Sequence, residues 1–216
     1  MGKLLIVGIG GTTRPGSSSE TALRIALAAA EALGARAQIF AGQSLTLPIF
    51  APERSERSAE AAALIAALRR ADGVIISSPG YHGLISGLIK NALDYTEDMR
   101  NDPRPYFDGR AVGCIACAAG WQAAGSTLAA LRSVAHALRG WPTPFGVSLN
   151  TSEPAFNEGV CVNPDVKAQL ALVSAQVVAF AASHRAYQAM ANDASPQFSI
   201  PPFFDPAQCA QRSTIA

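Results

Sequence analysis

The residues best suited to chemistry gather in one loop near the N-terminus. Behind the apolar run Leu4–Gly8, the chain reads Gly10-Gly11-Thr12-Thr13-Arg14-Pro15-Gly16-Ser17-Ser18-Ser19-Glu20. Glycines let backbone N–H groups approach an anion, and the helix that follows points the positive end of its dipole at the loop. Further donors come from a forked guanidinium and from hydroxyl groups, on Arg14, Thr12, Ser17 and Ser19. This pattern predicts a phosphate-binding loop.

Single positions exclude two common phosphate motifs. A dinucleotide fingerprint that starts at Gly8 requires a third glycine where this chain has Thr13. A triphosphate loop that starts at Gly11 requires a lysine where this chain has Ser17, so the main charge clamp for a nucleoside triphosphate is missing. A plain turn and helix cap would explain one serine, but not this whole set of donors. The loop therefore suits one terminal phosphate.

Two later glycine-rich loops also follow apolar runs. Pro79-Gly80-Tyr81-His82-Gly83 comes after Gly73–Ser77, and Ala119-Gly120-Trp121 comes after Ala111–Cys117. In an open α/β sheet, ligands bind beyond the carboxyl ends of the strands, where such loops meet. These loops carry few acids or bases, so they fit a flat cofactor held by backbone amides and edged by aromatic rings. We predict no catalytic side chain and no metal site.

Cysteines, charge and apolar runs limit the other functions. Cys114 and Cys117 form a CxxC inside an apolar run without a second ligand pair at zinc spacing, which predicts small buried residues. A formal net charge of +1 leaves no basic footprint for nucleic acid. The N-terminal run Leu4–Val7 is too short to span a membrane. With no disulfide framework implied, we expect a cytoplasmic protein without a nucleic-acid or membrane partner.

Apolar runs and helical patterns alternate five times along the chain. Strands are predicted at Leu4–Gly8, Ala37–Phe40, Gly73–Ser77, Ala111–Cys117 and Phe145–Leu149. Helices are predicted at Glu20–Leu33, Ser58–Ala71, Ser86–Met99, about 125–138 and 164–190. Short strands without polar alternation indicate a parallel sheet that helices cover on both faces. We therefore predict one α/β domain over residues 1–190, a doubly wound three-layer sandwich.

The last segment, 191–216, combines prolines with phenylalanines and is predicted to be a non-helical tail. Exposed aromatic rings are unfavourable in water, so packing on a neighbouring subunit is favoured over a mobile tail.

With these motifs together, the chain resembles the NADPH-dependent FMN reductase family of flavodoxin-like proteins. Members typically carry a Gly-Ser-x-Arg-x-x-Ser loop, which residues 11–17 match with Thr12 in place of serine. A later Pro-Glu-Tyr-Asn-Gly segment leads to Leu-Lys-Asn-Ala-Ile-Asp, and residues 79–83 and 89–94 match these. Gly80 stands where the family has an acidic residue, which removes any role for that side chain but keeps the backbone contacts.

The resemblance implies a flavodoxin-like sandwich with a five-stranded parallel sheet in the order 2-1-3-4-5. It also implies FMN as cofactor and NADPH or NADH as co-substrate. The implied cofactor-binding residues are Thr12, Arg14, Ser17, Ser19, Glu20, Pro79, Gly80, Tyr81, His82, Gly83, Ala119, Gly120 and Trp121. Lys90 and Asp94 lie four apart on a predicted helix and would pair with each other or across the interface of a homodimer or homotetramer.

The implied function is hydride transfer from NADPH to FMN and on to a flavin, quinone or similar small-molecule acceptor. The flavin carries the chemistry, in line with the lack of catalytic side chains. Two alternatives stay open: an electron carrier without its own nicotinamide site, and a flavodoxin-like fold without flavin. Carriers tend to be strongly acidic, so the charge of +1 counts against the first. Arg104 and Arg110 are available for an NADPH-specific phosphate, but no pattern assigns them.

Overall fold

The structure is a computed structural model that describes residues 2–193. The chain divides into two compact units, residues 1–183 and 184–216. The sheet, the candidate site and the covering helices belong to the first, except that the last helix continues past residue 183. The predicted tail, 191–216, lies outside the described residues except for its first three, which continue the last helix.

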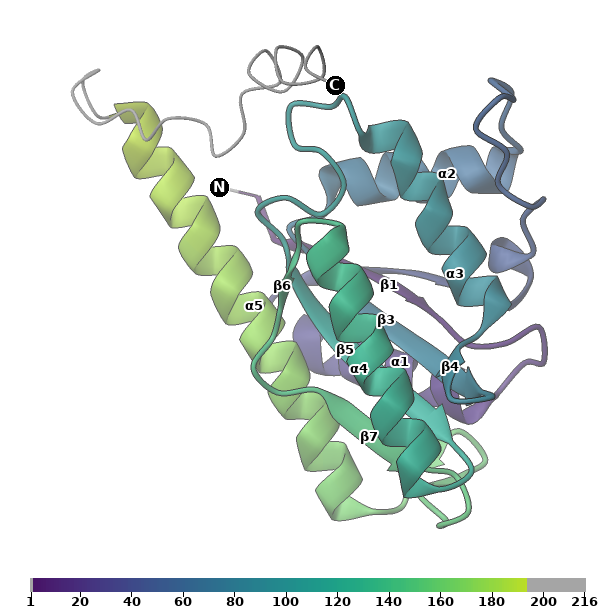
Figure 1. Ribbon diagram of the computed structural model, residues 1–216. Helices are drawn as coiled ribbons and strands as arrows, with labels where there is room; N and C mark the ends of the chain where they lie inside the picture. The colour runs from purple at the N-terminus through teal and green to yellow at the C-terminus, as the bar shows by residue number, and fades with distance from the viewer. Residues whose placement is uncertain (1, 194–216) are drawn as a thin grey trace, which may run out of the picture. The chain divides into compact units, whose positions relative to one another are not determined.

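A mostly parallel sheet forms the centre of the first unit (Figure 1). Its main strands are β1 (Leu5–Gly10), β2 (Arg36–Ala41), β3 (Gly73–Tyr81), β5 (Ala111–Ala118), β6 (Trp141–Pro142) and β7 (Val147–Asn150). The order is β2-β1-β3-β5, and both β6 and β7 pair with β5 in parallel. The strand order expected for a doubly wound sheet is therefore confirmed.

The predicted strand count was wrong, because the sheet has seven strands in the described part of the chain rather than five. Instead of one fifth strand at Phe145–Leu149, β6 and β7 occupy the edge as two short pieces. The Thr143 N–H still donates to Val112 O, but Pro144 has no N–H to donate, and pairing with β5 resumes only at Val147. The other addition is β4 (Leu84–Ile85), which pairs with β3 in antiparallel fashion.

Helices cover both faces of the sheet and create two separate cores. The helices are α1 (Ser18–Ala32), α2 (Ala59–Arg70), α3 (Gly87–Asp94), α4 (Trp121–Ala137) and α5 (Pro164–Asp193). Val7 and Ile76 belong to the core with α2, α3 and α4, whereas Ile6 and Ile75 belong to the core with α1 and α5. Successive strand residues thus reach opposite faces that are both buried, which explains the unbroken apolar runs.

Shorter elements complete the described chain and refine the predicted boundaries. They are the 3₁₀ turns Gly42–Leu45 and Tyr95–Met99 and the hairpin of β8 (Phe156–Asn157) with β9 (Val160–Cys161). The helix predicted at Ser86–Met99 is α3 followed by the second of these turns. The helix predicted from about residue 125 already begins at Trp121.

By length and composition, one helical stretch in the described chain, residues 164–191 of α5, is apolar enough to cross a membrane. Its apolar side is used within the fold, because Leu170, Val173 and Val177 are buried in the core beside the sheet.

The CxxC thiols lie inside the sheet, as predicted. Cys114 and Cys117 are both buried on β5, and burial raises the pKa of each thiol to about 12. At pH 8 only about one thiol in ten thousand with such a pKa is ionised, and the thiolate is the form that reacts. We expect iodoacetamide to label Cys161 and to leave Cys114 and Cys117 unmodified in native protein.

Peptide mass mapping of the alkylated protein measures this difference. The same reaction in urea provides the control, because Cys114 and Cys117 then become as accessible as Cys161. Labelling of Cys114 in the native state at the rate of Cys161 would contradict the buried assignment.

Candidate functional site

The glycine- and hydroxyl-rich loop joins β1 to the N-terminus of α1. Ser17 caps this helix, because its Oγ accepts a hydrogen bond from the Glu20 backbone N at 3.3 Å. The Ser17 and Ser19 hydroxyls lie 3.4 Å apart and are both buried. The loop predicted from sequence therefore has its hydroxyls at the positive end of a helix dipole.

Glu20 shapes this loop through its carboxylate. Oε2 accepts a hydrogen bond from the Gly16 backbone N at 3.3 Å, and Oε1 accepts one from Arg24 Nη2 at 2.7 Å. Its charge is thereby balanced by Arg24 on the next turn of α1. Glu20 thus orders the loop from within, and its predicted contact with a cofactor stays a prediction.

Several donors in the loop have no acceptor in the described part of the chain. The N–H groups of Ser18 and Ser19 begin α1, so they have no partner inside the helix. The exposed Arg14 guanidinium makes no hydrogen bond to any described residue. Only the backbone of Arg14 is bonded: its N–H donates to Thr12 Oγ1, and its carbonyl oxygen accepts from the same hydroxyl, at 3.1 Å each. A cation and free helix N–H groups at one place suit a phosphate dianion.

Hydrogen bonds and a shared hollow join the first loop to the end of β3. The Gly11 N–H donates to Ser77 O at 3.3 Å, and Ser77 Oγ donates to Ser19 O at 2.7 Å. Beside this contact lies a hollow of about 160 Å³. It is lined by Thr12, Thr13, Tyr81, Ser86, Gly87 and Leu88. The first two predicted loops therefore face one space.

The segment predicted as the loop after the third strand is largely a hairpin. β3 runs on to Tyr81, and the two-residue turn at His82 and Gly83 returns the chain into β4. Both turn residues have positive φ angles, 53° and 81°, as a type I′ turn requires. Histidine is among the few non-glycine residues that accept this conformation. Pro79 is buried in this hairpin, whereas Tyr81 and His82 are exposed.

Gly80 packs closely against the start of α4. A Cβ at this position would lie 2.5 Å from Thr127 Oγ1 and 2.9 Å from the Ala118 Cβ. The hairpin is therefore in direct contact with α4 and with the last residue of β5. The family that the chain resembles has an acidic residue at this position. Glycine stands here because α4 fills the space that a side chain would need.

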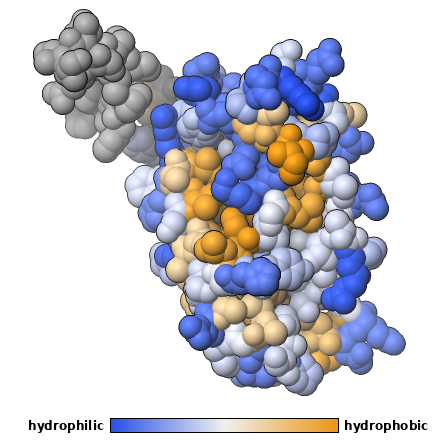
Figure 2. Space-filling view, turned by 45° about the vertical axis from the view of Figure 1, so that its right-hand side comes forward, coloured by the Kyte–Doolittle hydropathy of each residue, from blue (hydrophilic) through white to orange (hydrophobic). Residues whose placement is uncertain are grey.

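The third loop leads from β5 into α4. Ala119 is exposed, and Gly120 precedes the helix with a φ of 106°, which a glycine adopts readily. Trp121 begins the helix and is 58% exposed. Figure 2, which brings the side of α3 and β4 forward, shows apolar surface among polar side chains, and Tyr81 and Leu84 are exposed apolar residues of β3 and β4.

Sequence reasoning missed a fourth segment, the turn Asn150–Glu153 after β7. Asn150 Oδ1 accepts a hydrogen bond from the Gly120 N–H at 2.8 Å, and Glu153 Oε1 accepts one from Trp121 Nε1 at 3.0 Å. The sequence could have indicated this turn, because it follows the carboxyl end of a predicted strand, as the other three loops do.

Arg104 and Arg110 do not belong to this site. Arg110 directly precedes β5, at the opposite end of the parallel strands, and donates to Ala71 O and Arg69 O at 3.1 Å each. Burial, and next the charge of Arg104, lower the pKa of Arg110 to about 10. Burial also lowers the pKa of Arg104. Arg110 is thus a structural tie between backbone carbonyls.

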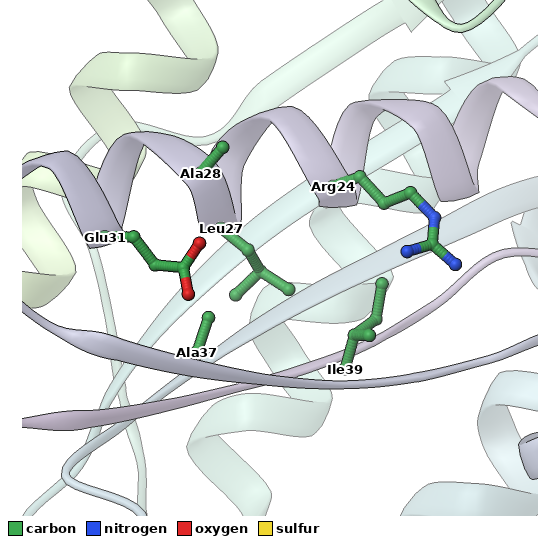
Figure 3. A pocket seen from close by; sticks show the side chains of 6 residues that line it. All are labelled: Arg24, Leu27, Ala28, Glu31, Ala37 and Ile39. Atoms are coloured by element: carbon green, nitrogen blue, oxygen red, sulfur yellow. The ribbon is translucent and has the colours of Figure 1, made fainter.

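Another hollow, of about 190 Å³, lies between α1 and the edge strand β2 (Figure 3). Figure 3 shows Arg24 and Glu31 on the α1 side, with Leu27, Ala37 and Ile39 as an apolar floor. Arg24 is already paired with Glu20. This hollow lies beside the strands rather than at their carboxyl ends, so its position does not support a cofactor site.

The topology defines a doubly wound α/β protein whose switch point lies between the neighbouring strands β1 and β3, and the glycine- and hydroxyl-rich loop follows β1 at this point. A family model described as NADPH-dependent FMN reductase matches residues 4–153. The chain belongs to this family.

Curated relatives match shorter segments. The chain is 44% identical over 50 residues to an NADPH azoreductase of Bacillus sp. (strain OY1-2), which covers 23% of this chain and 28% of that protein. It is 34% identical over 88 residues to an FMN-dependent NADPH-azoreductase of Staphylococcus aureus (strain USA300), which covers 41% and 43%. The chain thus spans less than half the length of the curated relatives it matches.

Solved structures share the fold over most of the chain. The apo form of an NADH:FMN oxidoreductase, EMOB, has a TM-score of 0.64 at 22% identity and covers 84% of this chain and 90% of its own. The WrbA-like flavodoxin of Agrobacterium tumefaciens has a TM-score of 0.58 at 20% identity and covers 85% and 99%. The flavodoxin-like fold is confirmed.

The family assignment confirms the resemblance seen in the motifs. The family's description, NADPH-dependent FMN reductase, agrees with the expected oxidoreductase, FMN cofactor and NADPH co-substrate. The roles of the individual cofactor-binding residues stay predictions.

Proposed function

We propose that the protein is an FMN-dependent NAD(P)H oxidoreductase that passes electrons from NADPH through FMN to a flavin, quinone or similar acceptor. The observation that carries this proposal is the set of uncommitted donors at α1, namely the Ser18 and Ser19 N–H groups and Arg14. They lie in the loop that shares a hollow with Tyr81. A phosphate-bearing, ring-containing cofactor fits both features.

The chain supplies binding and orientation. Arg14 and the N-terminus of α1 hold the phosphate dianion, while the Thr12, Ser17 and Ser19 hydroxyls add polar contacts. Pro79–Gly83 and Ala119–Gly120 line the ring with backbone, and Tyr81 and Trp121 cover it with exposed aromatic surface. When bound, FMN supplies the redox chemistry, taking a hydride from NADPH and delivering two electrons to the acceptor. With a quinone as acceptor, NADPH and one proton give NADP⁺ and the hydroquinone.

The proposal extends to partners and location. We infer a homodimer or homotetramer in the cytoplasm, with a small-molecule acceptor and with neither nucleic acid nor membrane as partner. Lys90 Nζ pairs with Asp94 on its own helix, so this ion pair is available within one chain. Size-exclusion chromatography with light scattering measures the assembly.

Cofactor binding and turnover test the function directly. We expect protein that is saturated with FMN and then desalted to stay yellow and to oxidise NADPH faster when a quinone, azo dye or free FMN is added. NADH in a parallel series measures the nicotinamide preference. Bound FMN without NADPH oxidation would instead indicate an electron carrier, and loss of all FMN on desalting, with no turnover on free FMN, would contradict the proposal.

A further inference from the structure

We propose that the turn Asn150–Glu153 positions the third loop of the site, with Glu153 orienting the Trp121 ring and Asn150 holding Gly120. This inference rests on the proposed function, because it assigns the turn to the same FMN site. Asn150 and Glu153 are positioning residues in it, since they act through Gly120 and Trp121.

The turn has a closed set of hydrogen bonds. Asn150 Oδ1 accepts from the N–H groups of Gly120 at 2.8 Å and Ser152 at 3.1 Å. Asn150 Nδ2 donates to Glu153 Oε1 at 3.0 Å, and the same oxygen accepts from Trp121 Nε1 at 3.0 Å. The Thr151 N–H donates to Ala118 O at 2.9 Å, which anchors the turn on the end of β5. One carboxylate oxygen thus connects the turn to the indole.

Trp121 depends on this connection for its orientation. More than half of its side chain is exposed, and the residue before it, Gly120, makes no side-chain cap for α4. A largely exposed indole gains little from packing, so a charge-assisted hydrogen bond at Nε1 restricts its rotamers most. The Gly120 N–H likewise donates to the side chain of Asn150.

The position of the turn ties it to the phosphate loop. A hollow of about 90 Å³ is lined by Ser18, the first residue of α1, together with Asn150, Thr151 and Glu153. The turn therefore lies beside the first residue of α1 and is bonded to the third loop at the same time. In the proposed site, Asn150 and Glu153 therefore set the position and angle of the Trp121 ring relative to the cofactor.

The test compares Glu153→Ala with Glu153→Gln, each in a Trp141→Phe background that leaves Trp121 as the sole tryptophan. We expect Glu153→Ala to lower the Trp121 fluorescence anisotropy and to raise the FMN Kd about tenfold, the scale of one lost hydrogen bond to a charged group. The amide oxygen of Glu153→Gln still accepts from Nε1, so this variant should recover most of both losses. Glu56→Ala, an exposed carboxylate in the loop before α2, is the matched control.

The thermal midpoint of each variant separates positioning from stability. A Kd for Glu153→Ala equal to wild type would overturn the inference, even if the anisotropy falls. A Glu153→Gln variant as weak as Glu153→Ala would overturn it as well. Wild-type protein that binds no FMN would overturn the proposed function instead, and the anisotropy would still report whether Glu153 holds Trp121.

Discussion

Replacing Arg14 by alanine and Ser17 by glycine in one chain is expected to raise the Kd for FMN about 100- to 10,000-fold. Each change removes a proposed phosphate contact, and a hydrogen bond to a charged group contributes about 1.5–3 kcal/mol. Glycine is chosen at position 17 because Ser17 caps α1. Alanine at an N-cap costs about 1 kcal/mol of stability, whereas glycine costs only a few tenths. The fold should therefore survive while the phosphate site is lost.

Flavin fluorescence titration measures the affinity, and urea unfolding checks the stability of the same preparation. A double variant with Arg36→Ala and Ser58→Gly is the matched control. It removes an exposed arginine from β2 and the N-cap of α2, outside the proposed site. We expect it to keep the wild-type Kd. An unchanged Kd in the Arg14 and Ser17 variant would mean that the phosphate binds elsewhere.

Gly80→Glu, which introduces the acidic residue typical of the NADPH-dependent FMN reductase family, should destabilise the protein by about 3 kcal/mol. The Cβ alone would lie 2.5 Å from Thr127 Oγ1 and 2.9 Å from the Ala118 Cβ, and neither is the far end of a flexible side chain. Overpacking of this kind typically costs about 1–3 kcal/mol, and burying a carboxylate in the contact adds to it. We expect Gly80→Ala to show the steric part, about 2 kcal/mol.

Urea unfolding of a double-mutant cycle identifies the cause. Thr127→Ala removes the nearest clashing atom, so Gly80→Ala should cost less in the Thr127→Ala background than in wild type. Gly125→Ala is the control, because a Cβ at Gly125 meets nothing within 4 Å. It should be neutral or slightly stabilising in the helix. A tolerated Gly80→Glu would show that α4 moves away from the hairpin at little cost.

The sequence by itself determined the parts of this protein that depend on local chemistry. A run of glycines and hydroxyls before a helix identifies a phosphate loop, since the helix N-terminus brings its own donors and dipole. Thr13 stands where the dinucleotide motif requires glycine, and Ser17 stands where the triphosphate motif requires lysine, so the sequence alone excluded both motifs. Apolar strands in alternation with helices likewise predicted the parallel sheet and the buried Cys114 and Cys117.

Only the tertiary structure decided which distant residues meet. The hydrogen bond between Glu153 and Trp121 joins residues 32 positions apart, and Gly80 on β3 lies close to Thr127 on α4. It also decided that Arg110 serves backbone carbonyls at the far end of the strands, and that β6 and β7 share one edge. These contacts depend on how the helices pack on the twisted sheet. The packing energy comes from many weak contacts between segments far apart in the sequence, so no local sequence pattern predicts it.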